Sequence, residues 1–412
     1  MAPAQKNAGK MFGRRGKGVG DWIRIDFVLV MALRMLTGDR AKYLGIVIAL
    51  AFTSFVMIQQ PATFLGILRH TYGFITDVGV GDIWVMDPKA RHLDDVKAMM
   101  DAQLQRVRGI DGVDWAMPIY KGGIRARLDS GDFVQCQLVG IDETTMIGGP
   151  GRMLTGQLAD LRQSDGIIVD AAAARDRLAE RGNGVRRPLV IGESIELNEH
   201  RAQVVGTATA SSNFQSMPTI YTTYSRVKTF LPSERKLLSF VLVGVKPGAD
   251  PQEVAADITR RTGLAAYTTQ GFIDRSLKYF LGNTGMIINF AMSAGLGFLI
   301  GAFIAGQTFF NFTTDNLRHF GVMKAMGAGN AMLVRMILVQ ALYLGCLGFG
   351  LGAGVGAMMG FQLAKVDAHL VFRLPWQLIA GGGLAALTVI TIAALLAIAK
   401  VARLEPAQVF KA

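Results

Sequence analysis

"TTDNLRHFGVMKAMGAG", residues 313–329, is a short charged segment that separates two long, apolar, glycine-rich stretches. The chain of 412 residues is 51% hydrophobic and contains 49 glycines, whereas charged residues make up only 18% of it. This composition is typical of a membrane protein, in which apolar helices cross the bilayer and polar segments connect them. The positions of the spans therefore decide the fold, and the connecting segments indicate the function.

Four apolar stretches are long enough to cross a bilayer, which takes about 20 residues in a helix. The basic leader before the first stretch is about 40 residues long, too long for a cleaved signal peptide, so we interpret that stretch as a retained anchor. We expect transmembrane helices at residues 44–67, 285–310, 336–361 and 376–399.

The distribution of positive charge indicates how the spans cross the membrane. Nine of the first 42 residues are Lys or Arg, so the positive-inside rule places the tail at residues 1–43 in the cytoplasm. Within it, residues 21–40 have an apolar face with interspersed arginines. We expect an amphipathic helix on the inner membrane surface there, with a cytoplasmic extension of the first span as the alternative. This orientation puts residues 311–335 and 400–412 in the cytoplasm, and residues 68–284 and 362–375 outside.

The polar block at residues 68–284 is long enough to fold as a domain. Near its two ends, residues 81–87 and 239–245 have the composition of strands, and helices are predicted after them at 93–107 and 250–263. Two similar units suggest one lobe built from both ends, with residues 143–235 as a mostly β insertion. The predicted fold class is an α-helical membrane protein with four transmembrane helices and a large extracytoplasmic α/β domain inserted between the first and second helices.

Glycines recur at helical spacing inside the spans. Small residues in such positions allow two helix backbones to approach closely, which favours helix association in lipid. We expect either a close helix interface, such as the seam of a dimer, or ordinary packing within one bundle. The candidate helix-packing residues are Gly297, Gly301, Gly348, Gly352, Gly356 and Gly360.

Common nucleotide-binding and catalytic motifs are not found in the sequence. It contains no G-x-x-x-x-G-K-[ST], no H-E-x-x-H and no G-x-S-x-G pattern. The five histidines are scattered, Cys136 and Cys346 fall in different regions, and no nucleic-acid motif accompanies the net charge of +12. We therefore expect no catalytic residue, no metal site, no bound cofactor and no nucleic-acid partner. The spans have almost no ionisable residues, which disfavours an ion pathway through the bilayer.

Four spans, a large domain between the first two, and the sequence "LRHFGVMKAMGAG" after the second resemble the MacB/FtsX/LolC-like permeases of ABC transporters (type VII, mechanotransmission). Within that family the chain is most similar to DevC-type exporter permeases, and the ending "ARLEPAQVFKA" also resembles the family's. The family has a pattern in which an arginine is followed by E-I-G-x-x-[RK]-A-L-G-A, and it aligns with residues 318–328. His319 and Phe320 replace the usual Glu and Ile. The matching residues are Arg318, Gly321, Lys324, Ala325, Gly327 and Ala328.

The resemblance implies a permease subunit of an ABC exporter in the bacterial inner membrane. A separate ATPase subunit would bind ATP and Mg, and its hydrolysis cycle would move the periplasmic domain. The substrate would be a lipid, glycolipid, peptide or drug-like molecule, exported through a tripartite assembly. The implied partners are the ATPase, a second permease copy in a homodimer, membrane lipid, a periplasmic adaptor and an outer-membrane duct. The alternatives are a lipoprotein-releasing permease, a membrane-anchored sensor with no transport role, and a membrane-bound enzyme.

Residues 311–335 would then contain the helix that couples the permease to the ATPase. We expect the apolar side chains of Phe320, Val322, Met323 and Met326 to fill a groove on the ATPase, and Gly327 and Gly329 to permit the turn into the third span. The alternative is an ordinary helix that links two spans. The candidate ATPase-coupling residues are Arg318, His319, Phe320, Gly321, Met323, Lys324, Ala325 and Gly327.

Overall fold

A computed structural model describes most of the chain and divides it into two compact units. The membrane unit contains the described residues up to Ala62, Phe290–Gln362 and those from Leu374, and the second unit contains Thr63–Asn289 and Leu363–Arg373. Most of the basic tail and of the expected amphipathic helix, the middle of the loop at 362–375, and the C-terminal tail lie outside the described residues. The structure describes residues 30–182, 185–213, 215–231, 234, 236–366 and 372–402.

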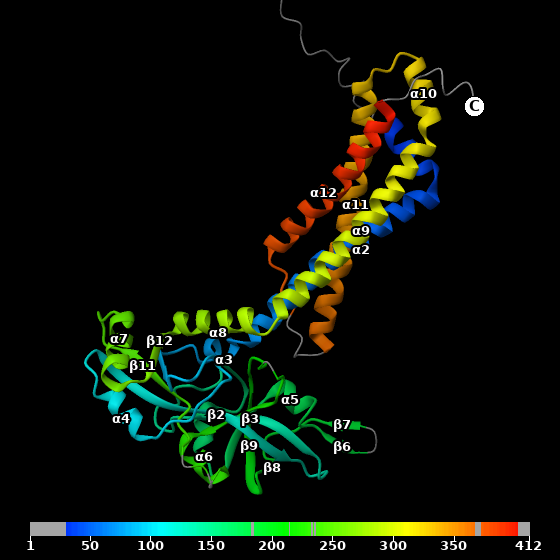
Figure 1. Ribbon diagram of the computed structural model, residues 1–412. Helices are drawn as coiled ribbons and strands as arrows, with labels where there is room; N and C mark the ends of the chain where they lie inside the picture. The colour runs from blue at the N-terminus through cyan, green and yellow to red at the C-terminus, as the bar shows by residue number, and fades with distance from the viewer. Residues whose placement is uncertain are drawn as a thin grey trace, which may run out of the picture. The chain divides into compact units, whose positions relative to one another are not determined.

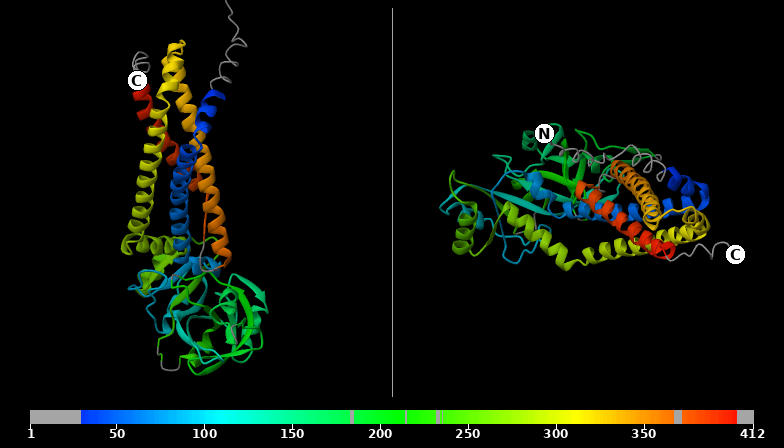
Figure 2. Two further views of the ribbon diagram at one scale, coloured as in Figure 1. Left: turned by 90° about the vertical axis from the view of Figure 1, so that its right-hand side faces the viewer. Right: turned by 90° about the horizontal axis from the view of Figure 1, so that it is seen from above.

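Among the described residues, four helices are long and apolar enough to cross a membrane. They are α2 (Arg40–His70), α9 (Met286–Asp315), α11 (Asn330–Val366) and α12 (Trp376–Ala402). Within the membrane unit they run side by side (Figures 1 and 2). Each follows one of the four apolar stretches, and α2 and α11 continue past theirs at both ends.

The core of the membrane unit joins all four long helices and the short helix α10 (Leu317–Ala325). Phe309 and Phe312 of α9 are fully buried there, beside Leu50 of α2 and Ile390 of α12. Residues 30–38 are also helical, and Ala32 and Leu36 belong to the same core. A bundle that buries aromatic and aliphatic side chains in this way positions α10 rigidly on its own spans.

The polar block is an α/β domain, and strands from its two ends pair with each other. β1 (Ile83–Met86), β11 (Phe240–Val245), β12 (Ala265–Thr268) and β2 (Val113–Arg127) form an antiparallel arrangement in the order β12-β1-β11-β2. The helices α4 (Ala102–Arg108) and α7 (Pro251–Thr262) contact each other and these strands. This arrangement agrees with the prediction that one lobe combines both ends of the block.

The sheet continues from β2 into a second group of strands, in the order β2-β3-β10-β5-β9-β4. Pairing is parallel between β3 and β10 and between β5 and β9, and antiparallel elsewhere along this path. The strands are β3 (Phe133–Ile141), β4 (Arg152–Thr155), β5 (Gly166–Asp170), β9 (His200–Thr209) and β10 (Thr219–Thr223); β8 (Ser194–Leu197) pairs with β2 and β9, and β6 (Glu180–Gly182) pairs with β7 (Val185–Arg187). Short helices complete the domain: α3 (Gly73–Val78), η1 (Leu158–Arg162), α5 (Ala171–Arg175), α6 (Tyr224–Phe230) and α8 (Thr269–Asn283).

The second lobe begins earlier in the chain than the predicted insertion at 143–235. β3 pairs with β10 and with the second half of β2, so both of these earlier strands belong to it. The long strand β2 passes through both lobes, because its first half pairs with β11 and its second half with β3. The mostly β character of the insertion was recognisable in the sequence, but the membership of β2 and β3 in the same lobe was not.

The helix predicted at 93–107 is wrong over most of its length, since α4 begins only at Ala102. Leu93 and Met99 are buried in irregular chain, and Met99 forms an isolated bridge to Leu238. Asp95 is held by Arg91 and Lys97. Such tertiary contacts outweigh the weak preference of the segment for a helix. By contrast, α7 follows its sequence signals, with Asp250 as a side-chain cap and Gly263 at φ +74° after its last turn.

Candidate functional site: a short helix between two spans

Local sequence explains where α10 begins and ends. Asn316 precedes it, and the main-chain carbonyl of Asn316 accepts hydrogen bonds from the amides of His319 and Phe320 at 3.0 and 3.2 Å. After the last turn, Gly327 has φ +96° and the Ala328 amide donates to the Met323 carbonyl at 3.0 Å. A residue with positive φ and this longer hydrogen bond are the features of a Schellman C-terminus, which explains the glycine.

Two faces of α10 have different surroundings. Phe320 is fully buried and Met323 is 8% exposed, and both belong to the core of the membrane unit. Val322 is 40% exposed and Met326 is 74% exposed. Phe320 and Met323 therefore pack against this chain's own spans, and the prediction that they fill a groove on a partner is wrong.

The remaining candidates on α10 divide between the same two faces. Gly321 is buried, and Lys324 is partly exposed. Arg318 and His319 are exposed, as are Ala325 and Gly327. Residues four apart lie on one face of a helix, so Arg318, Val322 and Met326 form a basic and apolar surface on the outer side of α10. We call these three residues the outer face of α10.

An ion-pair cluster connects the end of α9 to the beginning of α2. The ammonium of Lys42 lies 2.5 Å from a carboxylate oxygen of Asp315 and 3.1 Å from one of Asp39. Asp315 is the last residue of α9, immediately before the connection to α10. All three side chains are partly exposed, so these ion pairs add little to the free energy of folding. Their effect is to hold the ends of α9 and α2 next to each other. The sequence analysis did not identify these residues.

The glycines of α9 and α11 face α2 within the same chain. A methyl group on Gly297 would lie 2.4 Å from Val56 Cγ1, and one on Gly301 would lie 1.6 Å from Thr53 Oγ1. On α11, a methyl group on Gly348 would lie 2.5 Å from Leu50 Cβ. These contacts are closer than side chains allow, so only glycine permits this helix packing.

The other three candidate glycines on α11 follow the same ridge at four-residue spacing. A methyl group on Gly352 would lie 2.2 Å from the Ala51 carbonyl oxygen, whereas one on Gly356 would make an ordinary contact at 3.5 Å with Phe55. Gly360 is buried. These close contacts lie inside one bundle, as ordinary packing predicts. Gly297 and Gly301 of α9 and Gly348 and Gly352 of α11 already face α2, so they are not available for a dimer interface.

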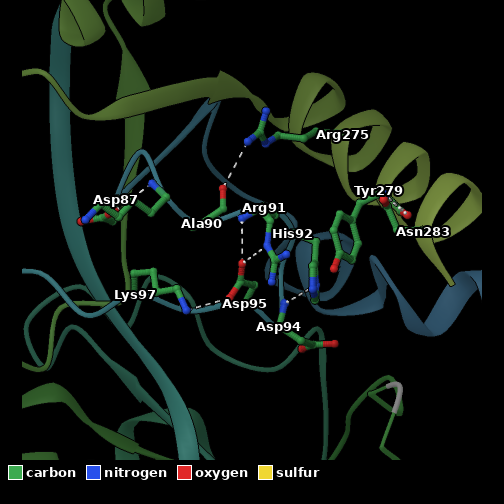
Figure 3. A network of polar contacts seen from close by, with 11 residues as sticks. Asp87, Ala90, Arg91, His92, Asp94, Asp95, Lys97, Arg275, Tyr279 and Asn283 are labelled. Atoms are coloured by element: carbon green, nitrogen blue, oxygen red, sulfur yellow. Dashed lines mark hydrogen bonds and ion pairs between the residues drawn. The ribbon is translucent and has the colours of Figure 1, made fainter.

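In the α/β domain, a cluster of polar and aromatic side chains attaches the segment after β1 to α8 (Figure 3). The His92 ring stacks on Tyr279 of α8 with centroids 4.4 Å apart, and the Arg91 guanidinium lies 5.2 Å from the centroid of the same ring. Arg275 of α8 donates to the Ala90 carbonyl at 3.3 Å. Only Thr284 and Gly285 separate α8 from α9, so this attachment holds the helix that leads into the second span.

The charged groups in this cluster are strongly paired. Burial raises the pKa of Asp95, but hydrogen bonds from Arg91 and Lys97 outweigh it and lower the pKa to about 2. Burial also lowers the pKa of His92 below its ordinary value. The Asp94 amide donates to His92 Nδ1 at 3.2 Å, a bond that needs the neutral imidazole. The cluster is therefore built around a neutral histidine.

Elsewhere in the described part of the chain, no cluster of side chains forms a recognisable catalytic or metal-binding site. Cys136 is buried in the α/β domain, where burial raises the pKa of its thiol to about 12, and Cys346 lies on α11. Among the residues that the structure describes, no three His, Cys, Asp or Glu side chains lie where they could hold a metal ion.

Two protein families match the sequence: the MacB-like periplasmic core domain at residues 44–261 and the FtsX-like permease C-terminal region at residues 291–406. The second match includes α10 and its flanking spans.

Individual proteins and one solved structure are also similar to the chain. An uncharacterized ABC transporter permease of Methanocaldococcus jannaschii is 19% identical over 386 residues, which are 88% of this chain and 92% of that protein. The macrolide export ATP-binding/permease protein MacB of Agrobacterium fabrum is 24% identical over 231 residues, which are 53% of this chain but only 34% of that protein. The crystal structure of the periplasmic region of MacB from Actinobacillus actinomycetemcomitans is 14% identical and aligns over 51% of this chain and 96% of that one, with a TM-score of 0.36.

Proposed function

The chain belongs to the family of MacB-like and FtsX-like ABC transporter permeases, and we propose that it is the permease subunit of an exporter driven by a separate ATPase. ATP and Mg²⁺ bind to that ATPase subunit, and this chain supplies the membrane spans and the periplasmic domain. Its place is the bacterial inner membrane, with the α/β domain in the periplasm and α10 in the cytoplasm. The observation that carries the proposal is the division of α10 into a buried and an exposed face.

The outer face of α10 is suited to contact a cytoplasmic protein. Met326 is 74% exposed, an unusual environment for a large apolar side chain on a connecting helix, and Arg318 provides a positive charge two turns earlier on the same face. The inner face, with Phe320 and Met323 in the bundle core, fixes the helix to the spans. A push on the outer face is therefore transmitted to the bundle instead of bending a free loop.

The contacts of α2 supply the next step of this mechanism. Glycines of α9 and α11 pack so closely against α2 that even a methyl group would not fit at the contact, so we expect these three helices to move together. α2 leads through Thr71 and Tyr72 to α3 of the periplasmic domain, and α8 leads into α9. Motion of the bundle thus reaches the periplasmic domain through two continuous chain connections, which is the mechanotransmission that we propose.

A second copy of the chain completes the transporter. The most apolar part of α9 has only 6% of its residues buried, against 39% or more in the other three spans. Its uncovered side chains recur at three- and four-residue spacing, and we assign this face to the homodimer contact. They include Ile288, Met292, Leu296, Leu299 and Phe303.

Export completes the proposal. The substrate is a lipid, glycolipid, peptide or drug-like molecule, and a periplasmic adaptor and an outer-membrane duct carry it onward. The macrolide export protein among the relatives supports this direction of transport.

The test is a charge placed on the outer face of α10. Val322→Asp and Met326→Asp each put a carboxylate into the proposed interface, where desolvation costs roughly several kcal/mol if it is unpaired. Both side chains are exposed in this chain, so folding of the bundle should be unaffected. Copurification of the ATPase, permease-stimulated ATP hydrolysis and export should all fall.

Met100→Asp is the matched control, because Met100 is a 52% exposed methionine in the α/β domain. This variant should keep ATPase binding and hydrolysis. If both α10 variants bind the ATPase and export like the unmodified protein, α10 is only a linker between spans and the proposal fails.

A further inference from the structure

A polar cavity opens in the α/β domain between β2, β3 and the segments that precede α4 and β10. Its volume is about 350 Å³, within the range of pockets that bind small organic molecules. Alternate residues of a strand share one face, and here Lys121 and Gly123 of β2 lie beside Gln135 and Gln137 of β3. The lining residues are Asp94, Val96, Lys121, Gly122, Gly123, Gln135, Gln137, Asn213, Gln215 and Met217.

The two charged residues in the cavity neutralise each other. Lys121 is only 4% exposed, and its ammonium forms an ion pair with the Asp94 carboxylate. The same ammonium lies 5.9 Å from the centroid of the Phe74 ring. A charged ligand would have to compete with this pair, so the cavity favours an uncharged one.

Primary amides supply most of the remaining polar lining. Asn213 Nδ2 donates to Gln137 Oε1 at 2.8 Å, and Asn213 Oδ1 accepts from the Met217 amide at 2.9 Å. This pairing fixes the Gln137 side chain, which is 4% exposed, and leaves its Nε2 as a donor. The side chains of Gln135 and Gln215 are exposed, and their amide groups have no hydrogen-bond partner among the described residues. These two adjustable amides and the fixed amide of Gln137 line the cavity.

The glycines of β2 keep this space open. A methyl group on Gly123 would lie 2.9 Å from Gln135 Nε2, so a larger residue would displace the amide that lines the cavity. Val96 and Met217 add apolar surface at its edge. A ligand that fits must therefore both donate and accept hydrogen bonds, carry no net charge, and have small apolar groups.

We propose that this cavity is a binding site for small uncharged molecules that bear amide groups, of which a capped short peptide is the simplest. The side-chain amides of Gln135 and Gln215 can each donate to and accept from a peptide group, and Gln137 Nε2 can donate to one. As a site for one of the proposed substrate classes, it rests on the proposed function. Binding itself requires neither the ATPase nor a second copy of the chain, so the two proposals can fail separately.

The cavity is connected to α8 by a short chain of contacts, of which Figure 3 shows the part from Asp94 to Tyr279. Asp94 pairs with Lys121 in the cavity, its own amide donates to His92 Nδ1, and the His92 ring stacks on Tyr279 of α8. A ligand that contacts Asp94 or Lys121 thus restricts the segment at residues 91–97 and, through it, α8. Occupancy of the cavity is in this way communicated to the helix that leads into the second span.

The first experiment measures binding of N-acetyl-trialanine amide to the full-length protein in detergent micelles by isothermal titration calorimetry. Saturable binding is expected, and Gln135→Leu and Gln215→Leu should each weaken it about tenfold, since each removes the hydrogen bonds of one amide. Gln252→Leu is the matched control, because Gln252 is exposed on α7, away from the cavity, and affinity should not change. Succinate and maltose test an anion and a sugar in place of the peptide.

Three results would each overturn the proposal: no binding of the peptide, the same affinity in the Gln135 and Gln215 variants as in the unmodified protein, or tighter binding of succinate or maltose than of the peptide. The second experiment is hydrogen exchange with and without the peptide. Residues 91–97 and α8 should exchange more slowly when the peptide is bound. His92→Ala should preserve binding but abolish the protection of α8, and equal protection in this variant would refute the connection.

Discussion

Replacing Gly352 by alanine adds one methyl group at the closest contact between α11 and α2. The added carbon would lie 2.2 Å from the Ala51 carbonyl oxygen, 2.8 Å from Ser54 Cβ and 2.9 Å from the Phe55 amide nitrogen. Two of these three atoms belong to the backbone of α2, which cannot rotate away as a side chain can. The two helices must therefore separate locally, which weakens the other contacts between α11 and α2.

The magnitude follows from a comparison with Gly350→Ala. Gly350 lies on the same helix, and a methyl group there would meet nothing within 4 Å. Alanine improves helix propensity by up to about 1 kcal/mol in either variant, so this contribution cancels in the difference. What remains is the overpacking, typically about 1–3 kcal/mol. We expect Gly352→Ala to be less stable than Gly350→Ala by this amount.

The assay is unfolding of the full-length protein by SDS in mixed micelles, followed by the loss of helical circular dichroism. Gly352→Ala should unfold at a lower SDS fraction than Gly350→Ala. Gly356→Ala should resemble Gly350→Ala, because its methyl group would lie 3.5 Å from the nearest atom, Phe55 Cδ2. If Gly352→Ala and Gly350→Ala unfold together, α2 and α11 are not in the close contact on which the reasoning depends.

Three further predictions concern other parts of the chain. Burial lowers the pKa of His92 from 6.5, so the unfolded chain binds the proton at a higher pH than the folded one, and the α/β domain should lose stability as the pH falls through 6.5. His92→Phe should flatten this pH dependence of the melting temperature. An unchanged slope would contradict the role of His92. Phe320→Ala should destabilise the bundle by about 3–5 kcal/mol in the SDS assay, whereas Val322→Ala should change little, and equal effects would mean that Phe320 is not a core residue. In a background without native cysteines, Phe133→Cys should react with an impermeant maleimide from outside the inner membrane and Met326→Cys only after permeabilisation; labelling of both from one side would refute the four-span topology.

The sequence predicted the features that depend on length and on strong local signals. The four spans were recognisable because bilayer thickness sets a minimum apolar length, and α7 because Asp250, Pro251 and Gly263 mark its ends. The fold class, with four long apolar helices and an α/β domain between the first and second, is confirmed.

Features that depend on tertiary contacts were not predictable in this way. Residues 93–101 have a helical composition but are held irregular by the Asp95 ion pairs and by the bridge at Met99. Phe320 and Val322 are both apolar residues of one short helix, and only the position of the bundle decides that Phe320 faces inward. The cavity likewise arises from distant residues, since Gln137 and Asn213 meet only when β3 and the segment before β10 come together.

The most direct test of the account is photo-crosslinking from the outer face of α10 in living cells. A benzoylphenylalanine residue replaces Met326 in one strain and Met100, the exposed methionine of the α/β domain, in another. After irradiation, crosslinked partners are identified by mass spectrometry. The account predicts a covalent product between position 326 and an ABC ATPase subunit, and no such product from position 100. Absence of the ATPase product from position 326, or its formation from position 100, would contradict the coupling role of α10.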